Sequence, residues 1–176
     1  MTKVKICGLS RVEDILAANE AMPDFVGFVF AKSRRQVSVN TAKMLKEILN
    51  PRIKAVGVFV DEAIENIVSL KDVIDMVQLH GGEGEEYIQK LKSVTGKPII
   101  KSVGVACRRD IEIADGLSAD YLLLDNVKGG SGETFDWGLI DHVKKPFFLA
   151  GGLDLENVKE ALKLKPYAVD VSSGVE

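Results

Sequence analysis

The sequence predicts an α/β fold of the (β/α)8 barrel class, and three observations support this. Eight short apolar runs rich in β-branched residues recur along the chain, and all but the last precede a stretch with helical spacing. The runs are continuously apolar rather than alternating, which is typical of a parallel sheet covered by helices. No G-x-G-x-x-G motif follows the first run, which disfavours the competing doubly wound dinucleotide-binding fold.

Each predicted strand is a run such as "FVGFVF" or "YLLLD", bounded by turn or polar residues. In chain order the eight runs begin near Val4, Phe25, Lys54, Met76, Pro98, Tyr121, Phe147 and Ala168. Eight strands in strict alternation with helices are the count of a closed parallel barrel.

The predicted helices share apolar residues at helical spacing. In chain order they cover Arg11–Ala21, Val39–Leu49, Glu62–Leu70, Glu85–Ser93, Arg109–Asp115, Asp136–Val143 and Leu155–Leu164. Ser10 and Glu13 have the spacing of a capping box, and Asp61, Asp136 and Asp154 stand where N-caps belong. The sequence stops after the eighth strand, so the prediction is one barrel domain, residues 1–176, without its final helix.

Composition excludes several classes of protein. The net charge is −3 with both signs interspersed, so no basic face indicates nucleic acid as a partner. Apolar runs such as Phe25–Ala31 are too short to span a bilayer, and the first ten residues lack a secretory signal. Cys7 and Cys107 form neither a disulfide framework nor a metal-ligand spacing. We therefore expect a cytoplasmic protein with no membrane and no nucleic-acid partner.

Catalytic residues of such barrels lie where the strands end, on the C-terminal face. Three different reactive groups stand there: the thiol of Cys7, the guanidinium of Arg34 or Arg35 and the carboxyl group of Asp125. Glycine-bearing turns follow the last two strands, at Gly151-Gly152 and Ser173-Gly174. Backbone N–H groups in these two turns commonly form a phosphate site, which predicts a phosphorylated ligand.

Several segments together resemble the phosphoribosylanthranilate isomerase family of tryptophan biosynthesis. They are "KICGLSRVEDILAA", "GFVFAKSRRQVS", "VGVFVD", "VQLHG", "LLLD…GGSGETFDW", "LAGGLDLENVKEAL" and "YAVDVSSGVE". The resemblance runs from Lys3 to Glu176 in the family's order, and it implies a barrel fold that needs no metal and no organic cofactor.

The resemblance implies an Amadori rearrangement of N-(5-phosphoribosyl)anthranilate, which needs one acid and one base. Asp125 would protonate the furanose ring oxygen, and Cys7 would remove the proton from the adjacent carbon. Arg35 would hold the anthranilate carboxylate, because a planar fork suits a planar anion. The remaining implied contacts are His80 and Asp170 on the substrate, and Gly151, Gly152, Ser173 and Gly174 on the phosphate.

General chemistry adds two expectations and leaves two alternatives open. A helix start and nearby cations favour the thiolate form of Cys7, and partial burial raises the pKa of Asp125. A lone cysteine is more often a small core residue, and His80 is equally well explained as structural.

Two other functions remain open. A histidine-pathway isomerase performs an analogous rearrangement, but it would be expected to carry Asp in place of Cys7 and a second phosphate site in the first half. A catalytically impaired barrel would only bind phosphate ligands. The absent final helix would expose an apolar stripe beside the first and eighth strands, which predicts self-association.

Overall fold

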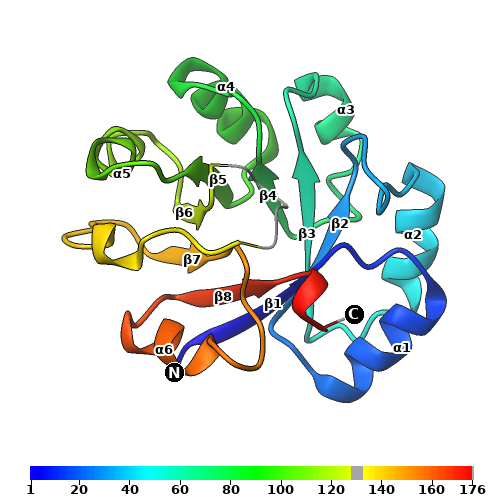
Figure 1. Cartoon of the computed structure of the whole chain (residues 1–176). Helices are drawn as coiled ribbons and strands as arrows, with labels where there is room; N and C mark the ends of the chain where they lie inside the picture. Colours follow the sequence, from blue (N-terminus) through cyan, green and yellow to red (C-terminus); the bar gives the residue numbers. More distant parts are fainter. Residues whose placement is uncertain (128–132, 176) are drawn as a thin grey trace.

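A computed structural model of the chain describes residues 1–127 and 133–175, which form a closed barrel of eight parallel strands (Figure 1). The strands are β1 (Lys3–Cys7), β2 (Phe25–Val29), β3 (Lys54–Phe59), β4 (Met76–Leu79), β5 (Ile99–Gly104), β6 (Tyr121–Asp125), β7 (Phe147–Leu149) and β8 (Ala168–Val171). The predicted fold class and all eight predicted strands are confirmed. Part of the loop after Asp125, residues 128–132, lies outside the described residues.

Each strand pairs with its neighbours in sequence, and β1 also pairs with β8 to close the sheet. In this register Cys7 lies opposite Gly27 of β2, while Lys5 lies opposite Asp170 of β8. Side chains alternate between the two faces of a strand, so Lys5 and Cys7 belong to one face. The closure therefore brings residues from both ends of the sequence to the same side of the sheet.

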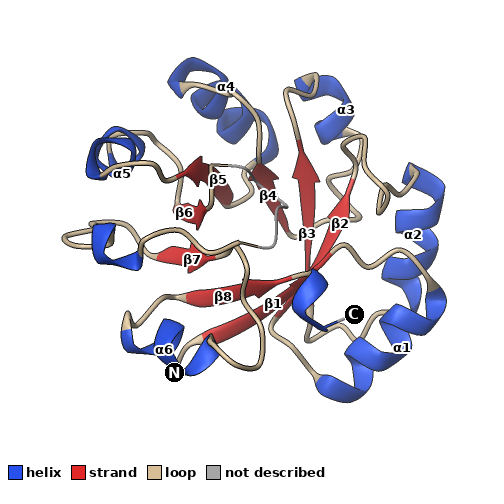
Figure 2. Ribbon diagram, viewed as in Figure 1, coloured by secondary structure: helices blue, strands red, loops and turns tan. Residues whose placement is uncertain are grey.

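Helices surround the strands, as Figure 2 shows. They are α1 (Val12–Ala21), α2 (Val39–Ile48), α3 (Ile64–Val68), α4 (Glu85–Thr95), α5 (Arg108–Asp115) and α6 (Val158–Lys163). No α-helix follows β8 in the described residues, where Ser173–Val175 form a 3-10 turn. None of the helices in the described ranges is long and apolar enough to cross a membrane.

Three predicted helices differ from the observed ones. The predicted helix Glu62–Leu70 is shorter, since α3 covers only Ile64–Val68. The predicted helix Asp136–Val143 is wrong, because only a 3-10 turn forms, over Trp137–Leu139. Asp136 caps this turn by accepting from the backbone N–H of Gly138 at 2.9 Å, and the left-handed backbone of His142 (φ 58°) prevents a continuing helix. The predicted helix Leu155–Leu164 is shorter, since α6 covers only Val158–Lys163.

Two of the predicted N-caps, Ser10 and Asp61, are displaced, whereas Asp136 caps its turn as predicted. Asp14, rather than Ser10, closes the start of α1, since its Oδ2 accepts from the backbone N–H groups of Ser10 and Arg11 at 2.9 and 3.0 Å. Asp61 lies outside α3 with a φ of 47°, and its Oδ1 accepts from the Gly82 N–H at 2.7 Å. Asp61 thus links the loops after β3 and β4 instead of capping a helix.

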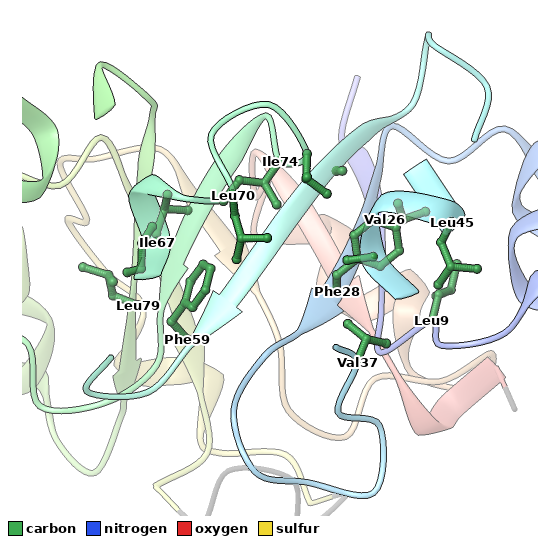
Figure 3. Packing of buried hydrophobic residues seen from close by; sticks show 14 of the residues in the cluster. Leu9, Val26, Phe28, Val37, Leu45, Phe59, Ile67, Leu70, Ile74 and Leu79 are labelled. Carbon is green, nitrogen blue, oxygen red and sulfur yellow. The ribbon is translucent and has the colours of Figure 1, made fainter. Parts of the chain in front are cut away.

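The core has an outer and an inner part. Outside the barrel, Leu45 of α2 and Ile67 of α3 belong to a cluster with Val26, Phe28 and Phe59 of the strands (Figure 3). The inside is filled by one residue from each of β2 to β8, together with Ala150 just after β7: Phe25, Val56, Met76, Ile100, Leu123, Phe148, Ala150 and Ala168. Tyr121 and Tyr167 pack on this inner cluster with ring centroids 4.8 Å apart. This packing fills the N-terminal half of the barrel and leaves its C-terminal end for the site.

Candidate active site

A cavity of about 450 Å³ opens at the C-terminal end of the barrel. It brings together eight of the nine predicted site residues: Cys7, Arg35, His80, Asp125, Gly151, Gly152, Asp170 and Ser173. Gly174 does not line it. Residues from β1 to β8 therefore meet in one space, although they are far apart in the sequence.

Cys7, the last residue of β1, lies against the glycine of the next strand. A Cβ added to Gly27 would lie only 2.6 Å from the Cys7 Sγ, so the absence of a side chain there makes room for the sulfur. Ser172 donates from its Oγ to the Cys7 carbonyl oxygen at 2.9 Å, which ties the end of β1 to the chain after β8. The thiol is thus held between two neighbouring strands.

Arg35 reaches the cavity across the turn that follows Cys7. Gly8 has a φ of 92°, a left-handed conformation that favours glycine, and a Cβ there would overlap the Arg35 side chain. Gly8 therefore allows the guanidinium arm to pass close to the backbone beside the thiol.

Lys5 is a site residue that sequence reasoning missed. Its side chain is fully buried, and its Nζ donates to Asp170 Oδ2 at 2.8 Å. Burial acts to lower the pKa of Lys5, but the charges and hydrogen bonds of Asp170 and Cys7 together outweigh burial and raise the pKa above its ordinary value. The sequence signal was its place two residues before Cys7, which puts both on one face of β1. A buried ammonium thus lies beside the thiol.

Burial dominates the ionisation of Cys7. It raises the pKa of the Cys7 thiol above its ordinary value, although the ammonium of Lys5 and the guanidinium of Arg35 act in the opposite direction. The expectation that this environment favours the thiolate is therefore wrong. The two cations reduce the cost of forming the thiolate without removing it.

Asp125, the last residue of β6, is also buried, with 8% of its surface exposed. Burial raises the pKa of its carboxyl group, and the Asn126 backbone N–H, which donates to Oδ1 at 2.7 Å, lowers it in part. The predicted direction is confirmed. A carboxyl group with a raised pKa is suited to donate a proton.

His80 follows β4 and faces Asp125, with 3.8 Å between its Nε2 and the carboxylate Oδ2. Burial lowers the pKa of His80, and the nearby Asp125 charge opposes this only in part. Gln78, a second residue that sequence reasoning missed, lies below it, with its Nε2 3.1 Å from His80 Nδ1. Gln78 and His80 are two residues apart, a spacing that places both on the inner face of the barrel.

The two glycine turns meet one another beside the acid. Gly151 and Gly152 have left-handed backbones, with φ of 81° and 60°, and a Cβ on Gly151 would lie 2.7 Å from Asp125 Oδ1. A Cβ on Gly174 would overlap the carbonyl oxygen of Leu153, so the turn after β8 rests directly on the turn after β7. Gly174 thus allows the two turns to pack closely, although it does not itself line the cavity.

A second cavity, of about 600 Å³, adjoins the first beside α1. It shares Cys7, Arg35 and Ser172 with the first and is otherwise lined by the end of β1, the turn after it, Val175 and α1 residues such as Ala17 and Ala21. Asp125 and His80 do not line it, so it lacks the acid that must act together with Cys7. The smaller cavity is therefore the candidate active site.

Comparison with known proteins gives one consistent family. The family described as PRAI, N-(5'phosphoribosyl)anthranilate (PRA) isomerase, matches residues 4–176. A relative from Endomicrobium trichonymphae named N-(5'-phosphoribosyl)anthranilate isomerase is 49% identical over 183 residues, covering 100% of this chain and 90% of its own length.

Solved structures agree with the family match. The phosphoribosyl anthranilate isomerase of Thermus thermophilus superposes with a TM-score of 0.91 at 35% identity, covering 99% of this chain and 89% of its own. A phosphoribosyl anthranilate isomerase in complex with reduced 1-(o-carboxyphenylamino)-1-deoxyribulose 5-phosphate superposes with a TM-score of 0.87 at 40% identity, covering 100% of this chain and 89% of its own.

Proposed function

The chain belongs to the N-(5'-phosphoribosyl)anthranilate isomerase family, and we propose that its barrel-end cavity rearranges N-(5-phosphoribosyl)anthranilate with Asp125 as acid and Cys7 as base. The protein is an isomerase of tryptophan biosynthesis. Its product is 1-(2-carboxyphenylamino)-1-deoxyribulose 5-phosphate. One observation carries the residue assignment: a thiol and a carboxyl group with a raised pKa line the same cavity as Arg35 and two glycine turns.

Asp125 acts first. Its carboxyl group donates a proton to the furanose ring oxygen, and the bond from that oxygen to C1 of the ribose breaks. The nitrogen lone pair of the anthranilate forms the new C=N bond, which gives an open-chain Schiff base. The raised pKa of Asp125 supports this role, because the group must hold a proton near neutral pH to donate it.

Cys7 acts second. Its thiol first loses its proton to solvent, at a cost that the Lys5 and Arg35 charges reduce. The thiolate then removes the proton from C2, and the electron pair forms a C1=C2 bond while the nitrogen regains its lone pair. The resulting enolamine tautomerises: the C2 hydroxyl loses its proton, C1 gains one, and a C2 ketone forms. Cys7 is then a thiol again, and Asp125 regains its proton from solvent, which balances the one that Cys7 released, without any net oxidation.

Lys5 and Arg35 support the base. The Lys5 ammonium lies beside the thiol and is held by Asp170, so a positive charge is fixed next to the sulfur before substrate arrives. Preorganised charge stabilises a developing anion more than mobile solvent does. We assign Arg35 to the anthranilate carboxylate, since its planar fork can donate two parallel hydrogen bonds.

The glycine turns form the phosphate site in this proposal. Backbone N–H groups of Gly151, Gly152, Ser173 and Gly174 would surround the 5-phosphate. The left-handed backbones of Gly151 and Gly152 support this, because successive N–H groups can then point toward one anion.

The proposal extends to organisation and location. Residues 1–176 act as one domain, since β1 and β8 pair directly and both carry site residues. The free thiols of Cys7 and Cys107 suit the reducing cytoplasm.

We place self-association at the apolar α1 surface beside β1, where Val12 and Leu16 are exposed. A monomer in sedimentation velocity at high protein concentration would contradict the association.

A fluorescence assay with freshly generated phosphoribosylanthranilate tests the function. We expect turnover by the parent chain, and its loss in both Cys7→Ala and Asp125→Asn. Cys107→Ala is the matched control, because that thiol is exposed and does not line the cavity. Undiminished turnover in either site variant would contradict the residue assignment. Binding of the reduced product analogue without turnover in the parent would instead favour the phosphate-binding alternative, and turnover of the histidine-pathway substrate would favour the other isomerase.

A further inference from the structure

We propose that Gln78 is a positioning residue that holds His80 as the neutral tautomer with its proton on Nε2, so that His80 presents an N–H group to Asp125. This inference rests on the proposed role of Asp125 as the acid. Neither Gln78 nor the tautomer of His80 follows from the family resemblance.

The geometry of Gln78 supports the tautomer. Its side chain is 2% exposed, and its amide Nε2 lies 3.1 Å from His80 Nδ1. In this orientation of the Gln78 amide, the nitrogen donates and His80 Nδ1 accepts, while Gln78 Oε1 is buried without a hydrogen-bond partner among the described residues. A neutral imidazole carries one proton, which is then on Nε2. That nitrogen is 3.8 Å from Asp125 Oδ2.

The same contact opposes a positive charge on His80. An imidazolium carries protons on both nitrogens, and the Nδ1 proton would point at the amide N–H of Gln78. Burial of the ring also disfavours the charged form. Four charged or titratable groups influence the ring from other strands: Asp125 on β6, Asp170 on β8, Lys5 on β1 and Lys101 on β5. The two carboxylates favour the imidazolium, and the two ammonium groups oppose it.

A neutral His80 benefits the acid in two ways. An imidazolium near Asp125 would stabilise the carboxylate and so remove the proton that Asp125 must donate. Once Asp125 has donated its proton, the Nε2–H of a neutral ring can donate a hydrogen bond to the new carboxylate as the two groups approach. His80 thus stabilises the product form of the acid without ionising it beforehand.

The inference predicts that the pKa of His80 depends on whether the side chain of residue 78 donates a hydrogen bond, accepts one or does neither. Gln78→Glu replaces the donor by a carboxylate that accepts a hydrogen bond from Nδ1–H, which favours the imidazolium. Gln78→Met removes the donor with an unbranched apolar chain of similar size, so it keeps β4 filled if the glutamate variant folds poorly. Both variants are predicted to raise the pKa of His80, and the glutamate variant more strongly.

The chain has two histidines, which makes the ring nitrogens accessible to ¹⁵N NMR. His142→Gln assigns the signals, because His142 is exposed and outside the site. We expect the Nε2–H tautomer for His80 in the parent chain. We expect Gln78→Glu to raise the His80 pKa by about one unit, and to lower kcat by about tenfold while moving the acidic limb of the pH–rate profile upward.

Two results would overturn the inference. One is an Nδ1–H tautomer in the parent chain, which would mean that Gln78 accepts rather than donates. The other is an unchanged His80 pKa in Gln78→Met. Both readouts are independent of turnover, so a failure of the proposed isomerase function is recognised separately, by turnover that survives Cys7→Ala and Asp125→Asn.

Discussion

The Lys5 Nζ lies 2.8 Å from Asp170 Oδ2 inside the barrel, and this ion pair joins β1 to β8 directly beneath the proposed base. The Lys5 side chain is fully buried and that of Asp170 is 8% exposed, so the pair is largely removed from water. A buried charge that loses its partner is costly, which makes the pair sensitive to any one-sided change. It is therefore both a structural and an electrostatic element of the site.

Lys5→Met should lower stability and activity together. Loss of the ammonium leaves Asp170 buried without its partner and is expected to reduce the free energy of unfolding by about 3 kcal/mol. The Cys7 pKa should rise further, so kcat/KM at neutral pH should fall by about 10²-fold and its basic limb move to higher pH. Denaturant unfolding and pH–rate profiles measure the two effects.

The double variant Lys5→Met with Asp170→Asn is the control, and it should recover stability but not the catalytic rate. An unshifted pH–rate profile in Lys5→Met would exclude the electrostatic role of the ammonium.

Gly27→Ala should impair catalysis by displacing the base. The new methyl group would lie 2.6 Å from Cys7 Sγ, so the sulfur must move. A displacement of about 1 Å from a productive geometry can reduce kcat by about 10²-fold. Gly84→Ala is the matched control, because a Cβ there meets nothing within 4 Å. Steady-state kinetics decide between them, and equal rates for the two variants would contradict the placement of the sulfur.

Asp125→Asn should increase stability above neutral pH while abolishing turnover. Burial raises the Asp125 pKa in the folded state, so the folded chain binds this proton more tightly than the unfolded chain. That stabilisation is fully present below the ordinary carboxyl pKa and is lost as the pH rises through the raised folded value. Asparagine carries no charge to desolvate, so its advantage should appear only at the higher pH. Thermal unfolding across pH tests this, and a variant less stable than the parent at pH 8 would contradict it.

The two thiols should differ in their reaction with iodoacetamide. Cys107 is exposed, whereas burial raises the pKa of the Cys7 thiol, and only the thiolate reacts. At neutral pH we expect Cys107 to be alkylated first, without loss of turnover, and Cys7 later, with its loss. Peptide mass spectrometry alongside the activity assay follows both. Cys107→Ala should lack the first phase only, and early modification of Cys7 would show that its thiol is more acidic than the structure indicates.

Gly174→Ala should weaken substrate binding more than it slows chemistry. A Cβ at this position would overlap the Leu153 carbonyl oxygen and so separate the two turns assigned to the phosphate. We expect KM to rise by about tenfold with a smaller change in kcat, the pattern of an interaction present in both ground and transition states. Inorganic phosphate should protect the parent against thermal unfolding more than it protects the variant. A fall in kcat with unchanged KM would place the phosphate elsewhere.

Regular elements of the barrel were predictable because their signals are local. Each strand is a continuous apolar run, and the starts predicted for β2, β3 and β4 agree with the structure to the residue. The predicted helix at Asp136–Val143 failed because Asp136 caps only a short turn and the backbone reverses at His142. The spacing of apolar residues does not indicate that a residue with a left-handed backbone, here His142, prevents the helix.

The site was predictable in its location and less so in its electrostatics. Asp125 ends β6, so its position and its burial both follow from the strand pattern. The ionisation of Cys7 did not follow, because it depends on desolvation by neighbours distant in sequence. Lys5 was missed because lysine in a strand is usually taken as solvent-facing, and its partner Asp170 is 165 positions away. Gln78 was missed for the same reason, since its role depends on the ring of His80.

The pairing of β1 with β8 also has a consequence during synthesis on the ribosome. β1 emerges well before β8, yet β8 pairs with one of its two hydrogen-bonding edges and supplies the counterion of Lys5. Until then the nascent chain carries an open sheet edge and an unneutralised ammonium. Contacts of such long sequence separation slow folding, and an unpaired strand edge is prone to aggregate. We therefore expect a partly synthesised chain to bind chaperones until its barrel closes.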